Sequence, residues 1–186
     1  MEEIAQQEVF LPLGMVSSSY SWRDDYDSLA VSGFNRDGQD RRKGNFPRAN
    51  AAYTLRTTAS DYMKFLEALS RGTGLGKESR IAIFTPVVQA VRYAGKPRDC
   101  DQRIFWGLGV GIEKHQKLGE VVFHWGDNGT FRSLFLVVPA KGLQPKRILV
   151  YFTNSQAGHD VISDITSLFF NNKEPLAIDQ WVNENE

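Results

Sequence analysis

Apolar residues repeat with a helical spacing in the first hundred residues of the chain. The clearest repeat has the i, i+3, i+4, i+7 spacing of an amphipathic helix. Its apolar positions are Tyr62, Phe65, Leu66 and Leu69. Thr58, three residues before Asp61, predicts a capping box at the start of this helix. Gly72 is placed to end the helix through a left-handed cap.

Two shorter segments also have a helical pattern. Residues 2–10 are typical of the last turns of a helix, which Pro12 stops because proline cannot continue a helix interior. Residues 77–84 predict a further helix that Pro86 limits. Between them, residues 17–50 are rich in Ser, Asp, Arg, Asn and Gly and show little periodicity. A stretch of this length is either a functional or binding loop or a surface excursion.

After residue 100 the spacing changes to the alternation of strands. The predicted strands are residues 104–112, in which bulky residues alternate with glycine, 121–125, 132–138 and 148–153. The turns that join the last three strands, residues 126–130 and 140–147, are short, so neighbouring strands are expected to be antiparallel. A last helix over residues 158–170 places an apolar stripe on one face, which we expect to cover the sheet. The stripe consists of Val161, Ile165, Leu168 and Phe169.

These elements predict an α+β fold in a single unit, residues 1–186. Residues 1–100 form its mainly helical and loop part. Residues 101–186 form an antiparallel sheet of about four strands with a C-terminal helix packed on it. A chain of 186 residues with 41% apolar residues is enough for one domain with a substantial core.

Charge and composition exclude several classes of partner. Lys plus Arg equals Asp plus Glu at 22 each, so no bulk field attracts nucleic acid or an anionic membrane. The basic run 41–43 sits among acidic residues and is typical of a solvated loop. No apolar stretch approaches the ~20 residues of a membrane span, and the acidic N-terminus is unlike a signal peptide. The sequence does not determine the compartment.

No metal or cofactor site is predicted. The acidic run 24–27 lacks the glycine and distal glutamate of a calcium loop. Residues 107–111 lack the spacing of a dinucleotide fingerprint and are interpreted as a glycine-rich strand. Cys100 is the single cysteine, so no internal disulfide can form, and we interpret it as an incidental thiol. His115 and His159 are expected at the surface.

Several motifs, taken in order, resemble the family of serine β-lactamases, penicillin-binding proteins and esterases of the class C type. The matching segments are Leu-Pro-Leu-Gly-Met at 11–15, residues 47–52 with 57–62, Trp-Gly-Leu-Gly at 106–109, His-Trp-Gly at 124–126 and Phe-Arg-Ser at 131–133. The resemblance implies a partial β-lactamase or transpeptidase-like fold. Each match is short, and the resemblance depends on the segments following one another in the same order as in the family.

The resemblance assigns roles to residues 124–128. His124 occupies the third-motif position, where the family's side chain steadies the carboxylate or ester and assists proton transfer. The backbone N–H of Asp127 maps to one of the two oxyanion donors. Trp125, Gly126 and Asn128 are implied to bind substrate. Without the resemblance, a histidine in this context is more often a hydrogen-bonded structural residue.

Two other family motifs are not found. No serine in the chain is followed three positions later by lysine, the S-x-x-K signature of the nucleophile. The Y-x-N motif should lie upstream of residues 11–15, and the Y-x-S match at 26–28 comes too late in the chain to fill its place. The chain therefore resembles a C-terminal half of a serine hydrolase for ester, amide or peptide substrates. Trp125 in place of the usual threonine disfavours β-lactam hydrolysis, and the chain alone is expected to be inactive.

Two alternatives stay open. One is a non-catalytic binding module that uses the 17–50 loop, Trp106 and Trp125 to hold a peptide or a glycan-linked ligand. The other is a truncated gene product. The expected partners are an N-terminal half of the same fold, or a second copy bound through an exposed strand edge, together with a small-molecule or peptide substrate. Which substrate is bound does not follow from the sequence.

Overall fold

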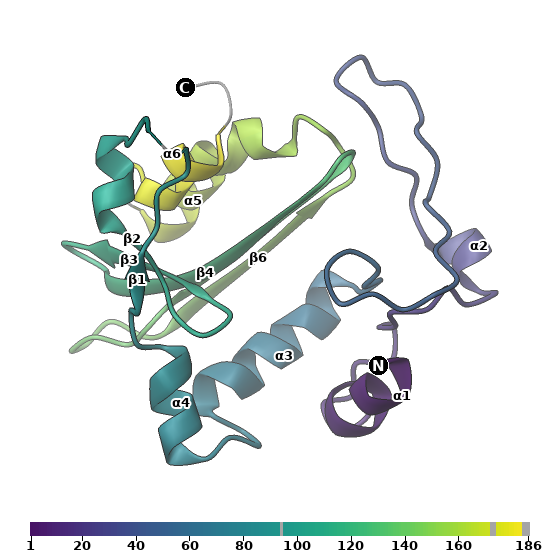
Figure 1. Ribbon diagram of the computed structural model, residues 1–186, viewed down its shortest axis with the longest axis horizontal. Coiled ribbons are helices and arrows are strands. Elements are labelled where there is room, and N and C mark those ends of the chain that lie inside the picture. The colour runs from purple at the N-terminus through teal and green to yellow at the C-terminus, as the bar shows by residue number, and fades with distance from the viewer. Residues whose placement is uncertain (94, 172–173, 184–186) are drawn as a thin grey trace.

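The computed structural model describes residues 1–93, 95–171 and 174–183. One six-stranded antiparallel sheet, ordered β1 to β6 as in the chain, forms the centre of the described part. Helices α5 and α6 cover one face, α3 lies on the other, and α1 and α2 lie beyond α3 (Figure 1). The strands are β1 Val88–Gln89, β2 Ile104–Trp106, β3 Gly111–His115, β4 Gly119–Asn128, β5 Phe131–Val138 and β6 Arg147–Thr153.

The helices agree with the sequence pattern in the first half of the chain. They are α1 Glu2–Ala5 continued by the π-helical turn η1 Gln6–Phe10, α2 Tyr26–Leu29, α3 Ala59–Arg71, α4 Lys77–Ile83, the 3-10 turns η2 Asp99–Arg103 and η3 Gly158–Val161, α5 Ile162–Phe170 and α6 Ala177–Val182. The predicted helices at 2–10, 58–72 and 77–84 are therefore confirmed. Helices α2 and α6, the turn η2 and strand β1 are short elements that periodicity did not predict.

Both ends of α3 form as expected, but its capping box is only half formed. The Thr58 hydroxyl accepts a hydrogen bond from the Asp61 N–H at 3.2 Å, and Gly72 ends the helix at φ 75°. The Asp61 carboxylate does not close the box. It accepts from the Ser17 N–H at 2.8 Å and from the Ser18 hydroxyl at 3.0 Å, so it ties the start of the long loop to α3.

The predicted strand 104–112 is wrong as a single strand: it forms β2 and β3, and together with the unpredicted β1 this raises the strand count from four to six. The chain reverses between β2 and β3, where the Gly107 N–H donates to the Val110 carbonyl at 2.8 Å. Gly109 has a φ of 85°, which only glycine adopts freely. A Cβ on Gly107 would lie 2.4 Å from the Ile83 carbonyl. The glycines therefore build a hairpin turn against the end of α4.

The C-terminal helix forms, but the face predicted to cover the sheet does not cover it. The residues of α5 that are buried are Ile162, Thr166 and Phe170. Three of the four residues in the stripe predicted to face the sheet are exposed, with Val161 at 46%, Leu168 at 83% and Phe169 at 43%, and Ile165 is half-buried. Helix α5 has two apolar stripes, and periodicity alone does not choose between them.

His115 and His159 are buried, contrary to the expectation that they lie at the surface. Nδ1 of His115 accepts from the N–H groups of Lys117 and Leu118, both at 3.2 Å, in the turn between β3 and β4. Burial, with a smaller effect of Arg103, lowers the pKa of His115. His159 Nε2 lies 3.3 Å from the Ser133 carbonyl. Both rings have structural partners.

Buried carboxylates fix helix α6 to the sheet. The Glu113 side chain is fully buried and accepts from the Ala177 and Ile178 N–H groups at 2.8 and 3.0 Å. Asp179 accepts from the Thr166 hydroxyl at 2.6 Å and from the Leu176 N–H at 3.1 Å. Burial is the main cause that raises the pKa of Asp179 to about 7.

The described residues contain one free thiol. Among the described residues no group of His, Cys, Asp or Glu is arranged to hold a metal ion. Cys100 is buried and free, and burial raises the pKa of its thiol. In the described ranges we find no helix with the length and apolar character that crossing a membrane needs.

Candidate active site at the end of β4

Strand β4 extends five residues beyond its neighbour β3. The β3 ladder ends with the pair Gly111 and Phe123, whereas β5 stays paired with β4 as far as Asn128. From His124 to Asn128, β4 therefore has a strand on one side only. The family resemblance placed its candidate site on these same residues.

The sheet register determines which backbone groups face the open side. The Val87 N–H donates to the Trp106 carbonyl at 2.9 Å, so Trp106 points its backbone groups toward β1. The backbone N–H and C=O groups of successive residues point alternately to the two sides of a strand. When this alternation is followed through the residue pairs of β2 with β3 and of β3 with β4, the backbone groups of odd-numbered β4 residues point toward β3. Beyond Phe123, the N–H and C=O groups of Trp125 and Asp127 therefore point into the open side.

A side-chain contact agrees with this orientation. Nδ1 of His124 lies 2.8 Å from the Trp125 carbonyl, which can only accept a hydrogen bond. The proton of a neutral His124 ring is therefore on Nδ1, and Nε2 is an acceptor. The imidazole is exposed, with ring centroids 5.7 Å from Trp106 and 6.4 Å from Phe135.

Side chains of the five site residues alternate between the two faces of the sheet. His124, Gly126 and Asn128 share a face with Phe135 and α3. Trp125 points to the α5 and α6 face, where its ring lies 6.0 Å from both the Trp181 and the His159 ring. The structure thus brings the backbone of all five residues to one strand end but separates their side chains.

Asp127 has a structural partner on the hairpin. Its carboxylate accepts a hydrogen bond from the buried Arg132 guanidinium, which also donates to the Gly129 carbonyl. This contact fixes the turn between β4 and β5. Arg132 was not predicted as a site residue. Its position directly after Phe131 in the Phe-Arg-Ser segment was the available signal.

Gly126 is required by its neighbour across the ladder. A Cβ at this position would lie 2.5 Å from the Ser133 hydroxyl oxygen, well inside van der Waals contact. The absence of a side chain at the glycine of the His-x-Gly motif therefore leaves space for the Ser133 hydroxyl on β5, so β4 and β5 can pair without a clash at the site.

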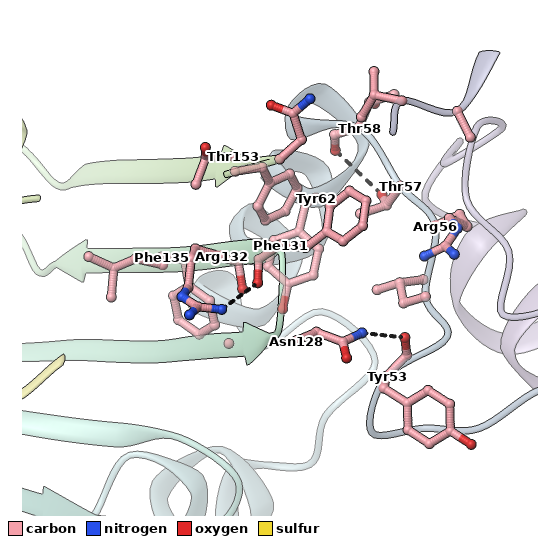
Figure 2. Close-up of a pocket in the computed structure, with 18 of the residues that line it drawn as sticks. Tyr53, Arg56, Thr57, Thr58, Tyr62, Asn128, Phe131, Arg132, Phe135 and Thr153 are labelled. Atoms are coloured by element: carbon pink, nitrogen blue, oxygen red, sulfur yellow. Dashed lines mark hydrogen bonds between the residues drawn. The ribbon is translucent and has the colours of Figure 1, made fainter. Parts of the chain in front are cut away.

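An open pocket of about 840 Å³ lies between the ends of β4 to β6 and the N-terminal segments. Figure 2 shows Phe131, Phe135 and Tyr62 on one side of it and Tyr53 and Arg56 on the other. The Asn128 side-chain amide donates to the Tyr53 carbonyl at 3.3 Å and closes one end. Burial, with a smaller effect of Tyr20, raises the pKa of Tyr62 to about 12, so its phenol stays neutral.

The long loop contributes to this pocket in part. Residues Arg23, Tyr26 and Leu29 to Val31 line it, whereas residues 32–50 do not. Trp106, which the binding-module hypothesis assigned to the ligand, packs against the core cluster on the α5 and α6 face. Trp125 is partly buried against the same cluster and also lines the pocket. Tyr62, Phe131 and Phe135 line the pocket as well and would offer further aromatic contact with a ligand.

A strand end with outward backbone donors, an exposed imidazole and an adjoining pocket has the geometry suited to binding a carbonyl or carboxylate group. The comparisons specify the family. The Beta-lactamase family model matches residues 1–170, and the chain belongs to this family. No curated protein matches the sequence.

Solved structures share the fold at low sequence identity. The octameric penicillin-binding protein homologue from Pyrococcus abyssi is 18% identical, with a TM-score of 0.71, over 94% of this chain and 39% of its own. A penicillin-binding protein from Bacillus halodurans is 22% identical, with a TM-score of 0.68, over 90% of this chain and 49% of its own. A class C β-lactamase is 17% identical, with a TM-score of 0.67, over 93% and 51%. The chain thus spans about half the length of these structures or less.

Proposed function

We propose that the chain is the C-terminal part of a β-lactamase-like serine hydrolase that acts on an ester, amide or peptide through an acyl-enzyme. In this proposal residues 124–128 form one wall of the catalytic groove. The observation that carries the proposal is the open side of β4, where the Asp127 N–H points outward next to the exposed His124 imidazole.

The geometry supports a role in two steps of acyl transfer. The nucleophile adds to the substrate carbonyl, whose oxygen becomes an anion. The Asp127 N–H is oriented to donate to that oxygen. His124 Nε2 accepts the proton that the nucleophile's hydroxyl loses as it attacks and donates it to the leaving group when the bond to that group breaks. Trp125 contributes its backbone here, since its ring points to the other face of the sheet and packs partly buried against the core.

The nucleophile must come from outside residues 1–186 in this proposal. No serine of the chain has a lysine three positions later, and the chain spans 39 to 51% of the length of the three structures described above. Oxyanion donors without a nucleophile leave only weak catalysis. We therefore expect the chain alone to be inactive and to need a polypeptide that supplies the serine, the lysine and the tyrosine.

Hydrolysis of a chromogenic short-chain ester and a chromogenic cephalosporin tests the proposal. The purified chain is expected to turn over neither substrate faster than its His124→Ala variant. Turnover that the His124→Ala substitution removes would show that a nucleophile is present in the chain and would refute the missing-nucleophile proposal.

A binding measurement tests the site itself. Titration of the chain with a short aryl carboxylate is expected to shift the amide resonances of Trp125 and Asp127, because both N–H groups point to the open side of β4. The His124→Ala variant is the matched control for loss of the imidazole. Shifts confined to residues remote from β4 would refute the placement of the site.

The aromatic lining of the pocket favours a second candidate function, a non-catalytic binding module. Tyr62, Phe131 and Phe135 give it an apolar wall of the kind that holds a ligand without chemistry. This candidate predicts saturable binding with no turnover, even when an N-terminal partner is supplied. We also propose that the chain self-associates. The Pyrococcus abyssi homologue is an octamer, which is consistent with this proposal.

A further inference from the structure

Helix α6 lies beyond residue 170, where the match to the family model ends. It has six residues, and a helix of this length is not stable by itself in water. Five of the six residues, all except Gln180, are buried. Contacts with the rest of the molecule therefore determine whether α6 forms.

A buried carboxylate on the sheet requires α6 at this position. Glu113 of β3 is fully buried, and its two carboxylate oxygens accept hydrogen bonds from the N–H groups of Ala177 and Ile178, the first two of α6. Without α6 the carboxylate would lose both hydrogen bonds in apolar surroundings, which is strongly unfavourable. The sequence of β3 is therefore suited to a docked α6.

The docked helix places an indole ring against the residue at the centre of the candidate site. The Trp181 ring centroid lies 6.0 Å from that of Trp125 on β4, at an interplanar angle of 81°. It also lies 6.0 Å from the ring of Trp106 and 6.5 Å from that of Phe123. Arg92, in the loop after β1, lies over both indoles, with its guanidinium carbon 4.2 Å from the Trp125 centroid and 5.2 Å from the Trp181 centroid. The Trp125 ring is therefore held by α6 and by a cation.

Ring packing accounts for the position of Trp181. Its indole N–H is buried and has no hydrogen-bond partner among the described residues. A buried tryptophan N–H usually has such a partner. The contacts of the ring are therefore what this side chain contributes.

The pairing of β4 with β5 does not hold the Trp125 peptide groups. Trp125 lies opposite Leu134 of β5, but its N–H and C=O point to the other, open side of β4. Its carbonyl instead accepts the hydrogen bond from Nδ1 of His124 at 2.8 Å. The direction of this carbonyl therefore decides where the imidazole lies and which of its nitrogens carries the proton. Contacts that fix the Trp125 ring also restrict the peptide group attached to the same Cα.

We propose that Trp181 and Arg92 are positioning residues of the candidate site: they hold the Trp125 ring and, through the Trp125 carbonyl, orient the His124 imidazole. This role rests on the proposed function, in which His124 accepts and returns a proton. Both residues pack on the face of the sheet opposite to His124, so they act through Trp125. Helix α6 is then part of the support of the site as well as part of the core.

Nitrogen-15 NMR of the His124 side chain in the unliganded chain tests the positioning. At a pH at which the ring is neutral, the contact with the Trp125 carbonyl keeps the proton on Nδ1, so the two ring nitrogens should resonate far apart. In Trp181→Ala the two resonances should move toward each other, because both tautomers become populated. Trp181→Phe keeps a ring and removes the unpaired N–H, so it should preserve the separation. Val182→Ala shortens another buried side chain of α6 that has no ring, and as the matched control it should preserve the separation too.

Arg92→Gln tests the second contact. Arg92 is half-buried, so this variant decides the question if Trp181→Ala does not fold. It should move the resonances in the same direction by a smaller amount, whereas Lys96→Gln, at an exposed position of the same loop, should leave them unchanged. An effect of Val182→Ala as large as that of Trp181→Ala would show a purely structural role and overturn the proposal. Unchanged resonances in Arg92→Gln and in a folded Trp181→Ala would overturn it as well.

Binding of the short aryl carboxylate gives the functional readout. Trp181→Ala is expected to weaken binding about fivefold or more, and Trp181→Phe is expected to retain it. Equal affinities of Trp181→Ala and the unchanged chain would contradict the positioning role. If the carboxylate binds to none of the proteins, the proposed site is refuted, whereas the imidazole resonances, which need no ligand, still decide the role of Trp181.

Discussion

The two faces of the sheet differ in how completely they are covered. On one face, α5 and α6 enclose a core that includes Phe123 and Trp181, and buried carboxylates hold α6 in place. On the other face, α3 covers the middle of the sheet and leaves a pocket of about 840 Å³ at the end of β4. The covered face supplies stability, whereas the partly open face holds the groups suited to binding and chemistry.

Phe123→Ala should produce the largest effect, because it removes a fully buried ring from the covered face. The ring also lies over Gly111, where a Cβ would be 2.2 Å from it. We expect a loss of about 3–5 kcal/mol in the free energy of unfolding, measured by urea denaturation. Phe131→Ala on the pocket face is the comparison and should cost clearly less. Equal losses would contradict the difference between the faces.

Asp179 should make stability depend on pH. Its folded pKa of about 7 lies above the unfolded value near 4, so the contribution is complete below the unfolded pKa and is lost as pH rises through 7. We expect the free energy of unfolding to fall by about 2–3 kcal/mol between pH 5 and pH 8. Asp179→Asn should flatten this dependence. An unchanged slope in the variant would show that another group causes it.

Gly126→Ala should have a moderate effect on the pocket face. The new Cβ would meet the Ser133 hydroxyl at 2.5 Å, so the strands must shift at a cost of about 1–2 kcal/mol. Thermal denaturation of Gly126→Ala and of the double variant Gly126→Ala with Ser133→Ala measures this. The double variant should recover most of the loss. No recovery would mean that the clash is not the cause.

His124→Ala should have the smallest effect on stability. Its side chain is exposed, so we expect a change below about 0.5 kcal/mol in the urea experiment. The same variant is expected to lose the response of the Trp125 and Asp127 amides to the carboxylate. A loss of stability comparable to that of Phe123→Ala would make His124 a core residue and remove the contrast between the faces.

Prediction from the sequence succeeded where local chemistry dominates. The Thr58 cap, the Gly72 stop and the alternation in β4 to β6 depend on near neighbours, and all formed. The strand 104–112 was wrong because alternating glycine fits a strand and a tight turn equally well, and contact with α4 decides between them. His115 was wrong because its partners are turn N–H groups that no periodicity displays.

The sequence by itself determined the α+β order of elements, the family resemblance and the position of His124 on a strand; the turn predicted at 126–130 begins later, because β4 continues to Asn128. The tertiary structure decided which stripe of α5 is buried and that the side chains of Trp125 and His124 point to opposite faces of the sheet. It also decided that β4 extends beyond the end of β3 at the site. The physical reason is that caps and alternation act between residues a few positions apart. Whether an apolar helix stripe is buried and whether a strand edge is exposed depend instead on which segments, distant in the sequence, pack against them.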